Sequence, residues 1–303
     1  VKEDCVIQNQ TLPVLYEAPI MLEDAGLAKI VMRELHMEEK QAWNLDDWKE
    51  MVERIKSCSK EVKIALVGKY VQLQDSYLSI VEALHHGGWI NRVNVKIDWI
   101  DSEELNKDNL TERLGGADGI IIPGGFGDRG IEGMILAAGY ARENNIPYLG
   151  ICLGMQIAAI SYARDVLGLS DANSGEFAPD GVHKVIDLMP DQQGNLPKGG
   201  TMRLGAYPCN ILPGSVLEQC YGEARIAERH RHRYEFNNAY RDLFAEHGMV
   251  FSGTSPDNRL VEAVELPNHP FYIGVQFHPE FKSRPNRPHP LFRSFIHAIC
   301  EKA

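Results

Sequence analysis

Apolar and polar residues follow two alternating patterns along the first half of the chain. Short apolar runs of strand length fall at residues 63–67, 93–100, 119–122 and 147–151, and segments with helical spacing separate them at 76–86, 103–114 and 132–144. Alternation of this kind predicts parallel βαβ units with helices on both faces of one sheet. The sequence therefore predicts an α/β fold in three layers, built on a mostly parallel, open sheet.

The later part of the chain is richer in short apolar runs. We expect strands at 182–188, 224–229, 250–252, 261–265 and 272–277, and a closing helix at 291–301. Residues 191–200 are polar and contain Gly and Pro, which is typical of a loop. This loop is a candidate lid.

The first 58 residues have a pattern of their own. An apolar stripe with helical spacing runs from Ile20 to Leu35, and Asn44 stands where it can cap a second helix that bears Trp48 and Met51. Both stripes indicate packing surfaces rather than binding sites. We expect an appendage over residues 1–58 and one larger domain over 59–303.

Composition and charge exclude several classes of protein. The 303 residues are 44% hydrophobic and carry a net charge of −11, which argues against nucleic acid or an anionic membrane as the main partner. No apolar run approaches the roughly 18 residues that a membrane span needs. The six cysteines are scattered and include no Cys-x-x-Cys, so disulfides and zinc both fit poorly, and a cytoplasmic location is expected.

The candidate chemistry starts at Gly-Ile-Cys-Leu-Gly, residues 150–154. The small residues allow a sharp turn from a strand into a helix, as in the nucleophile elbow of serine hydrolases. Such a turn places the sulfur of Cys152 at a helix N-terminus, where N–H groups and the helix dipole favour thiolate. Cys152 is therefore a candidate nucleophile, although a buried structural cysteine is an equally good interpretation of the pentapeptide alone.

Partners for this cysteine occur elsewhere in the chain. His278 and Glu280 follow an expected strand and can point to the same side, so the imidazole can take the thiol proton while the carboxylate holds its other nitrogen. Pro-Gly-Gly-Phe-Gly at 123–127 also follows a strand, and its backbone N–H groups could share an oxyanion with that of Leu153. A tight turn is the simpler interpretation of the loop alone.

The combination of motifs resembles a known family. Residues 123–127, Gly-Ile-Cys-Leu-Gly-Met-Gln at 150–156 and Phe-His-Pro-Glu-Phe at 277–281 are similar to the three signatures of class I, triad-type glutamine amidotransferases. Gly-Gly-Thr-Met-Arg-Leu-Gly at 199–205 and Glu-Arg-His-Arg-His-Arg-Tyr at 228–234 narrow the resemblance to the glutaminase domain of CTP synthases. The family's fold is flavodoxin-like, in agreement with the α/β pattern.

The resemblance implies roles for individual residues. It makes Cys152 the nucleophile, His278 the general base and Glu280 the acid that orients it, with Gly125 and Leu153 in the oxyanion hole. The implied glutamine-binding set is Gly125, Leu153, Gly154, Met155, Gln156, Glu176 and Arg233.

In that set, Glu176 would hold the α-ammonium of the substrate and Arg233 its α-carboxylate. A guanidinium suits the latter because it clamps a carboxylate bidentately. A solvated loop charge and a solvated basic run are the simpler interpretations of these two residues. Arg203 is a candidate for a lid or a GTP switch, and a surface charge on a mobile turn is the alternative.

The resemblance also implies a reaction. It is the hydrolysis of L-glutamine to glutamate and ammonia through a glutamyl thioester, with the ammonia supplied to an ATP-dependent conversion of UTP to CTP. We expect no cofactor or metal in this chain. Mg²⁺, ATP and UTP are implied for an amidoligase domain that is nearly all absent here and of which residues 1–58 resemble the tail and linker. GTP as an allosteric ligand, and a homotetramer formed through that domain, are implied as well.

Two other classes of function remain open. One is a different cysteine hydrolase on the same sheet, such as a peptidase, which would not need the amino-acid clamp of Glu176 and Arg233. The other is a non-catalytic binding or filament-forming module, against which the intact Cys152, His278 and Glu280 argue.

Overall fold

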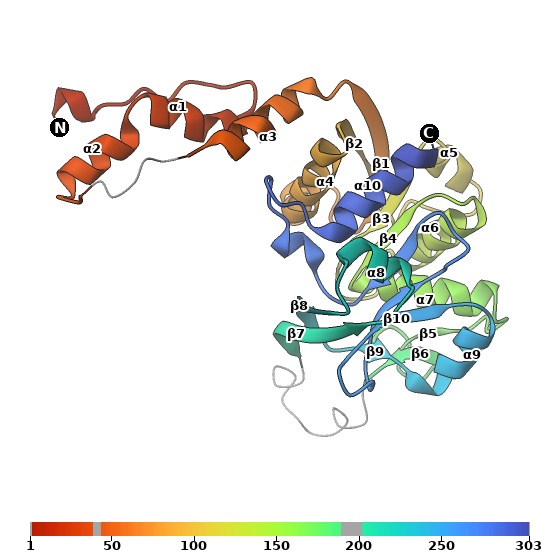
Figure 1. Cartoon of the computed structure of the whole chain (residues 1–303). Helices are drawn as coiled ribbons and strands as arrows, with labels where there is room; N and C mark the ends of the chain where they lie inside the picture. Colours follow the sequence, from red (N-terminus) through yellow and green to blue (C-terminus); the bar gives the residue numbers. More distant parts are fainter. Residues whose placement is uncertain (1, 39–43, 189–201, 303) are drawn as a thin grey trace. The chain divides into compact units, whose positions relative to one another are not determined.

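The computed structural model describes residues 2–38, 44–188 and 202–302. The chain divides into two compact units, Val1–Lys60 and Glu61–Ala303. Their elements are labelled in Figure 1. None of the helices in the described ranges is both long and apolar enough to cross a membrane.

The first unit is helical. It contains the short 3-10 helices η1 (Glu3–Cys5) and η2 (Leu15–Glu17) and the helices α1 (Ala18–Asp24), α2 (Leu27–Glu34) and α3 (Asp46–Ser57). The expected apolar stripe is divided between α1 and α2, because Gly26 between them is left-handed with φ +82°. The indole N–H of Trp48 in α3 donates to the carbonyl of Tyr16 in η2 at 2.7 Å. The N-cap of α3 is Leu45 rather than the expected Asn44, whose side-chain oxygen accepts from the backbone N–H of Asp46 at 2.7 Å.

The second unit is built on a large mixed sheet. Among the described residues it has nine strands in the order β2-β1-β3-β4-β12-β11-β10-β7-β8. They are β1 (Lys60–Gly68), β2 (Val93–Asp101), β3 (Gly119–Ile122), β4 (Tyr148–Ile151), β7 (Arg203–Ile211), β8 (Arg225–His232), β10 (Val250–Thr254), β11 (Val261–Glu265) and β12 (Tyr272–Val275). The pairs from β1 through β3 and β4 to β12 are parallel, and those from β12 to β8 are antiparallel.

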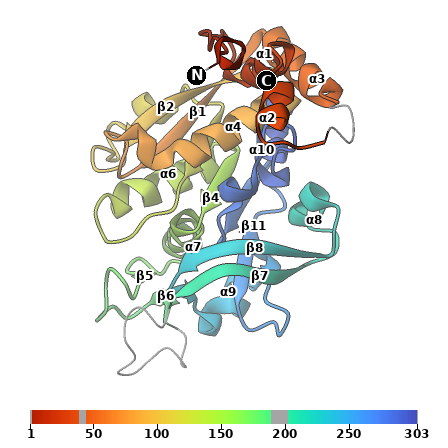
Figure 2. The same ribbon diagram turned by 90° about the vertical axis from the view of Figure 1, so that its left-hand side faces the viewer.

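Helices cover both faces of this sheet (Figures 1 and 2). Alternate residues of β1 show how the two apolar cores arise: Ile64 and Leu66 pack in one core, Ala65 and Val67 in the other. The first core includes residues of α4 (Leu78–Ile90), α8 (Val216–Tyr221) and α10 (Pro290–Lys302). The second includes residues of α6 (Ile131–Glu143), α7 (Leu153–Asp165) and α9 (Arg241–Glu246). The α/β class in three layers is confirmed.

Smaller elements complete the unit. A second sheet in the described part has the order β5-β6-β9 and consists of β5 (Asn173–Ser174), β6 (Lys184–Asp187) and β9 (Glu235–Phe236). The remaining short helices are η3 (Gln74–Tyr77), α5 (Leu110–Leu114), η6 (Asn238–Tyr240) and η7 (Pro279–Lys282).

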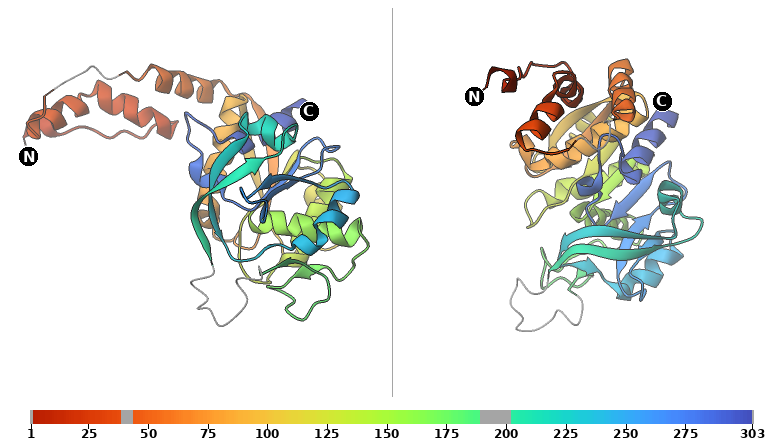
Figure 3. Two further views of the ribbon diagram at one scale, coloured as in Figure 1. Left: turned by 60° about the horizontal axis from the view of Figure 1, so that its bottom comes forward. Right: turned by 60° about the vertical axis from the view of Figure 1, so that its left-hand side comes forward.

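Three local expectations differ from the structure. The helix expected at 103–114 is only α5, because the side chains of Asn106 and Asn109 bond to backbone N–H groups in front of it, and such local bonds compete with a helix. Strand β7 was not expected; its residues Arg203 to Asn210 pair with β8, and the two strands run side by side in Figure 3. The strand expected at 272–277 ends at Val275. The candidate lid, 191–200, lies outside the described residues.

Candidate functional site

Cys152 occupies the turn that the sequence predicts. It is the N-cap of α7, directly after β4, and its backbone is strained, with φ 51° and ψ −98°. Its N–H donates to the carbonyl of Val275 at 2.7 Å, which ties the turn to β12. The flanking glycines are required: a Cβ on Gly150 would lie 2.6 Å from the backbone of Gly154. The sulfur is therefore held at the N-terminus of α7, at the carboxyl edge of the parallel strands.

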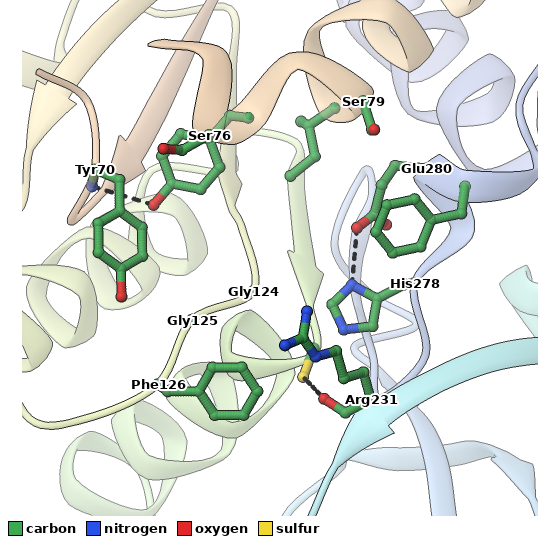
Figure 4. Close-up of a pocket in the computed structure, with 13 residues that line it drawn as sticks. Tyr70, Ser76, Ser79, Gly124, Gly125, Phe126, Arg231, His278 and Glu280 are labelled. Atoms are coloured by element: carbon green, nitrogen blue, oxygen red, sulfur yellow. Dashed lines mark hydrogen bonds and ion pairs between the residues drawn. The ribbon is translucent and has the colours of Figure 1, made fainter. Parts of the chain in front are cut away.

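His278 and Glu280 lie at the same edge of the sheet, where the neighbouring strand β12 leads into η7. His278 Nδ1 is 2.8 Å from Glu280 Oε1, and the backbone N–H of His278 donates to the carbonyl of Arg229 at 2.7 Å. A carboxylate only accepts hydrogen bonds, so the proton is on Nδ1. The other ring nitrogen, Nε2, is left for the hydrogen bond with Cys152. Figure 4 shows the His278–Glu280 contact.

The surroundings of His278 favour its charged form. Burial alone would lower its pKa, but the hydrogen bonds to Cys152 and Glu280, with their negative charges, raise the pKa to about 10. The nearby His230 and His232 behave in the opposite way, since burial and then Arg203 lower their pKa values to about 2 and about 3. An imidazolium is thus stabilised at His278 alone of these three.

The glycine-rich loop lies beside both the cysteine and the histidine. A Cβ on Gly125 would lie 3.2 Å from the side chain of Leu153, and one on Gly124 would lie 2.8 Å from Cε1 of His278. Lys69, which is 2% exposed, anchors the loop by donating to the carbonyls of Phe126, at 3.0 Å, and Gly127. Burial lowers the pKa of Lys69. The two expected oxyanion residues, Gly125 and Leu153, therefore lie against each other.

Two cavities meet at Cys152. The larger, of about 310 Å³, opens towards the residues labelled in Figure 4, among them Tyr70, Phe126 and Arg231. The smaller, of about 50 Å³, is lined by Gly125, Phe126, Cys152, Gln156, Glu176, Met202, His232, Arg233 and Tyr234. The candidate nucleophile Cys152, the acidic Glu176 and the basic Arg233 therefore line the same cavity.

Most of the expected glutamine-binding set lines this smaller cavity. Glu176 is held there by the backbone N–H of Gly127, which donates to Oε1 at 3.0 Å. Leu153, Gly154 and Met155 line neither of the two cavities. Met155 is fully buried in the core, and Gly154 packs against the backbone of Ile122.

Arg203 lies in an ordered, mostly buried position. It begins β7, and its guanidinium donates to Glu262 at 2.8 Å and Glu235 at 3.3 Å. The ring of Tyr207 lies 4.6 Å from the guanidinium. Burial raises the pKa of Glu235 to about 8. Two carboxylates thus hold Arg203 at the start of a strand, and its expected role in a lid or a GTP switch stays a prediction.

Four residues beside the site were not expected from the sequence. Gly124 and Lys69 shape the oxyanion loop, the carbonyl of Arg231 lies 4.0 Å from the sulfur, and the side chain of Gln276 contacts it. Gly124 and Arg231 stand within motifs that the sequence singled out, and Gln276 stands near the end of an expected strand, so these positions were the available signal. No group of three or more His, Cys, Asp or Glu among the described residues is arranged to hold a metal ion.

Comparisons with known proteins agree with this geometry. The family described as "Glutamine amidotransferase class-I" matches residues 72–298. The chain is 59% identical over 298 residues to a CTP synthase of Clostridium kluyveri, a match that covers 98% of this chain and 55% of that protein. A CTP synthase of Clostridium acetobutylicum is 56% identical over 297 residues, with 98% and 55% covered. The chain spans about half the length of these curated relatives.

One solved structure is matched over nearly its own full length. It is the glutaminase domain of the Trypanosoma brucei CTPS with bound acivicin, which is 42% identical with a TM-score of 0.76 and of which 95% is covered, against 80% of this chain. The chain therefore belongs to the class-I glutamine amidotransferase family, as a glutaminase domain of the CTP synthase type.

Proposed function

We propose that this chain hydrolyses L-glutamine to glutamate and ammonia, with Cys152, His278 and Glu280 as its catalytic residues. The observation that carries the proposal is the position of the Cys152 thiol. It opens into a cavity whose wall includes Glu176 and Arg233, and it is paired with an imidazole that Glu280 orients.

The reaction follows from these groups. The thiolate attacks the side-chain amide carbon, and the oxyanion that forms takes hydrogen bonds from the backbone N–H groups of Gly125 and Leu153. The His278 imidazolium gives its proton to the departing nitrogen, which leaves as ammonia. Imidazole then takes a proton from water, the hydroxyl attacks the glutamyl thioester, and glutamate leaves as the thiolate is restored.

Recognition of the substrate rests on its two charged groups. Glu176 would accept from the α-ammonium, and Arg233 would donate to the α-carboxylate in a bidentate pair. Gln156, on the same wall, is a further contact. A peptide bond within a chain offers neither free charge, so this clamp favours a free amino acid over a peptide.

We propose a wider role from the relatives. In a longer protein of the CTP synthase type, the ammonia would serve the Mg²⁺- and ATP-dependent conversion of UTP to CTP in a separate amidoligase domain. Residues 1–58 would then belong to the tail of that domain and the linker. A homotetramer formed through that domain, control by GTP and a cytoplasmic location stay predictions.

The test is the release of glutamate and ammonia from glutamine. We expect release by the wild-type protein and none above background by Cys152→Ala. Acivicin, which is bound in the T. brucei glutaminase domain, should label Cys152. Cys209 is a matched internal control, since burial raises its pKa to about 12. Labelling of another cysteine, or undiminished turnover after Cys152→Ala, would contradict the proposal.

A further inference from the structure

A buried side-chain amide, that of Gln276, contacts the sulfur of Cys152. Gln276, which is fully buried directly after β12, places its side-chain Nε2 3.6 Å from Cys152 Sγ. Its backbone N–H donates to the carbonyl of Glu262 at 2.8 Å, so the main chain at this point is fixed to β11. The contact is therefore built into the sheet rather than made by a surface side chain.

Neighbouring hydrogen bonds decide which end of this amide faces the sulfur. The backbone carbonyl of Tyr234 can only accept, and Gln156 Nε2 donates to it at 3.2 Å. The same nitrogen lies 3.2 Å from the side-chain oxygen of Gln276 and can use its second hydrogen there. A reversed Gln276 amide would set two N–H₂ groups against each other. The nitrogen of Gln276 must therefore point to Cys152.

We propose that Gln276 is a further catalytic residue, which donates a hydrogen bond to the Cys152 thiolate and thereby stabilises it. The proposal rests on the proposed glutaminase function. The thiolate is the attacking group when the thioester forms and the leaving group when it breaks, so a fixed N–H donor serves both half-reactions. His278, the N-terminus of α7 and Gln276 present donors to the sulfur, while the carbonyl of Arg231, 4.0 Å away, is an acceptor for the thiol form.

The Gln276 amide carries no charge, which makes its effect separable from that of the charged groups around the thiol. The titratable and charged residues that line the two cavities are Tyr70, Tyr77, Glu176, Arg231, His232, Arg233, Tyr234, His278 and Glu280. Lys69 lies behind Gly125. A substitution at Gln276 that removes only the donor leaves all of them in place.

The test is the pH dependence of Cys152 alkylation by iodoacetamide in the intact protein. Gln276→Met keeps an unbranched side chain of similar length but has no N–H. We expect the kinetic pKa of Cys152 to rise by about one unit, which is roughly a tenfold lower rate on the acid side of the profile. Gln219→Met, an exposed substitution of the same kind on α8, is the matched control and should reproduce the wild-type profile.

A second variant keeps the test decisive if Gln276→Met does not fold. Gln276→Leu also removes the N–H and introduces no titratable group, so its profile should shift in the same direction as that of Gln276→Met. A wild-type profile in a folded variant would overturn the inference. If wild-type Cys152 is not labelled ahead of the other cysteines, the proposed nucleophile fails instead, and the two failures are thus distinguishable.

Discussion

At the scale of single residues, a substitution at Arg233 can separate the binding of glutamine from the chemical step. Arg233→Lys keeps the charge but loses the planar fork that fits a carboxylate. We expect this to cost about 1.5–3 kcal/mol, as a raised KM for glutamine with little change in kcat, because the α-carboxylate does not react. Steady-state kinetics measure this. Arg225→Lys, an exposed change on β8, the strand that ends one residue before Arg233, should leave KM unchanged. An unchanged KM in Arg233→Lys would remove Arg233 from the clamp.

His278 also predicts a dependence of stability on pH. Its pKa in the folded protein, about 10, lies above the ordinary value of 6.5. The protonated ring therefore stabilises the folded state fully below pH 6.5, and this contribution is lost as the pH rises towards about 10. We expect the urea midpoint of the wild type to fall more over this interval than that of His278→Gln. Parallel curves for the two proteins would contradict the raised pKa.

At the scale of elements, the loop after β3 is fitted closely to the catalytic histidine. A Cβ on Gly124 would lie 2.8 Å from the His278 ring. The backbone of Gly124 is not in the left-handed region, so an alanine there would cause no backbone strain. Gly124→Ala should therefore displace the ring without unfolding the protein, and a displacement of this size can cost about 100-fold in kcat. Gly116→Ala, whose nearest contact would be 3.8 Å, is the matched control. Equal kcat values for both variants would show that the ring adapts.

Ion pairs of Arg203 connect the first residue of β7 to Glu235 of β9 and Glu262 of β11. Removing the guanidinium leaves Glu235 and Glu262, both nearly fully buried, without their cation. We expect Arg203→Ala to lower the free energy of unfolding by about 3 kcal/mol, measured by urea denaturation. Arg225→Ala, an exposed change on β8, should lie close to the wild type. A loss no larger than that of the control would mean that the carboxylates become neutral at little cost.

The same strand shows what the sequence could and could not predict. The elbow at Cys152 and the strands around it depend on local signals, namely an apolar run, small residues and a helical pattern. The sequence therefore predicts the turn from β4 into α7 that the structure contains. Arg203 was instead expected to belong to a lid or a GTP switch, and no strand was expected there. The partners that make this segment a strand, β8 and Glu262, are distant in the chain, and no local pattern reveals them.

At the scale of the whole second unit, the site depends on the register between β4 and β12. Ile151 pairs with Val275 where β4 and β12 end, so Cys152 and Gln276, the first residue after each strand, come to lie side by side. The motifs predict that cysteine and histidine meet at one edge of a sheet, but they do not predict which strands are neighbours or in which register. The triad could therefore be expected from the sequence, whereas the contact of Gln276 with the sulfur could not.

At the scale of the whole protein, the chain spans about half the length of its curated relatives, and control by GTP is a prediction at this scale. CTP synthases of this kind are expected to use GTP to switch on glutamine hydrolysis, and the larger cavity beside Cys152 is rimmed by exposed aromatic side chains of Tyr70, Phe126 and Phe281. If residues of an amidoligase domain complete the GTP site, the 303-residue chain should show weak glutaminase activity that GTP stimulates little. A protein that also contains that domain should respond strongly, while acivicin labels Cys152 in both. Ammonia release with and without GTP measures the difference. Strong stimulation of the 303-residue chain alone would place the whole switch within these residues and exclude coupling between domains as its cause.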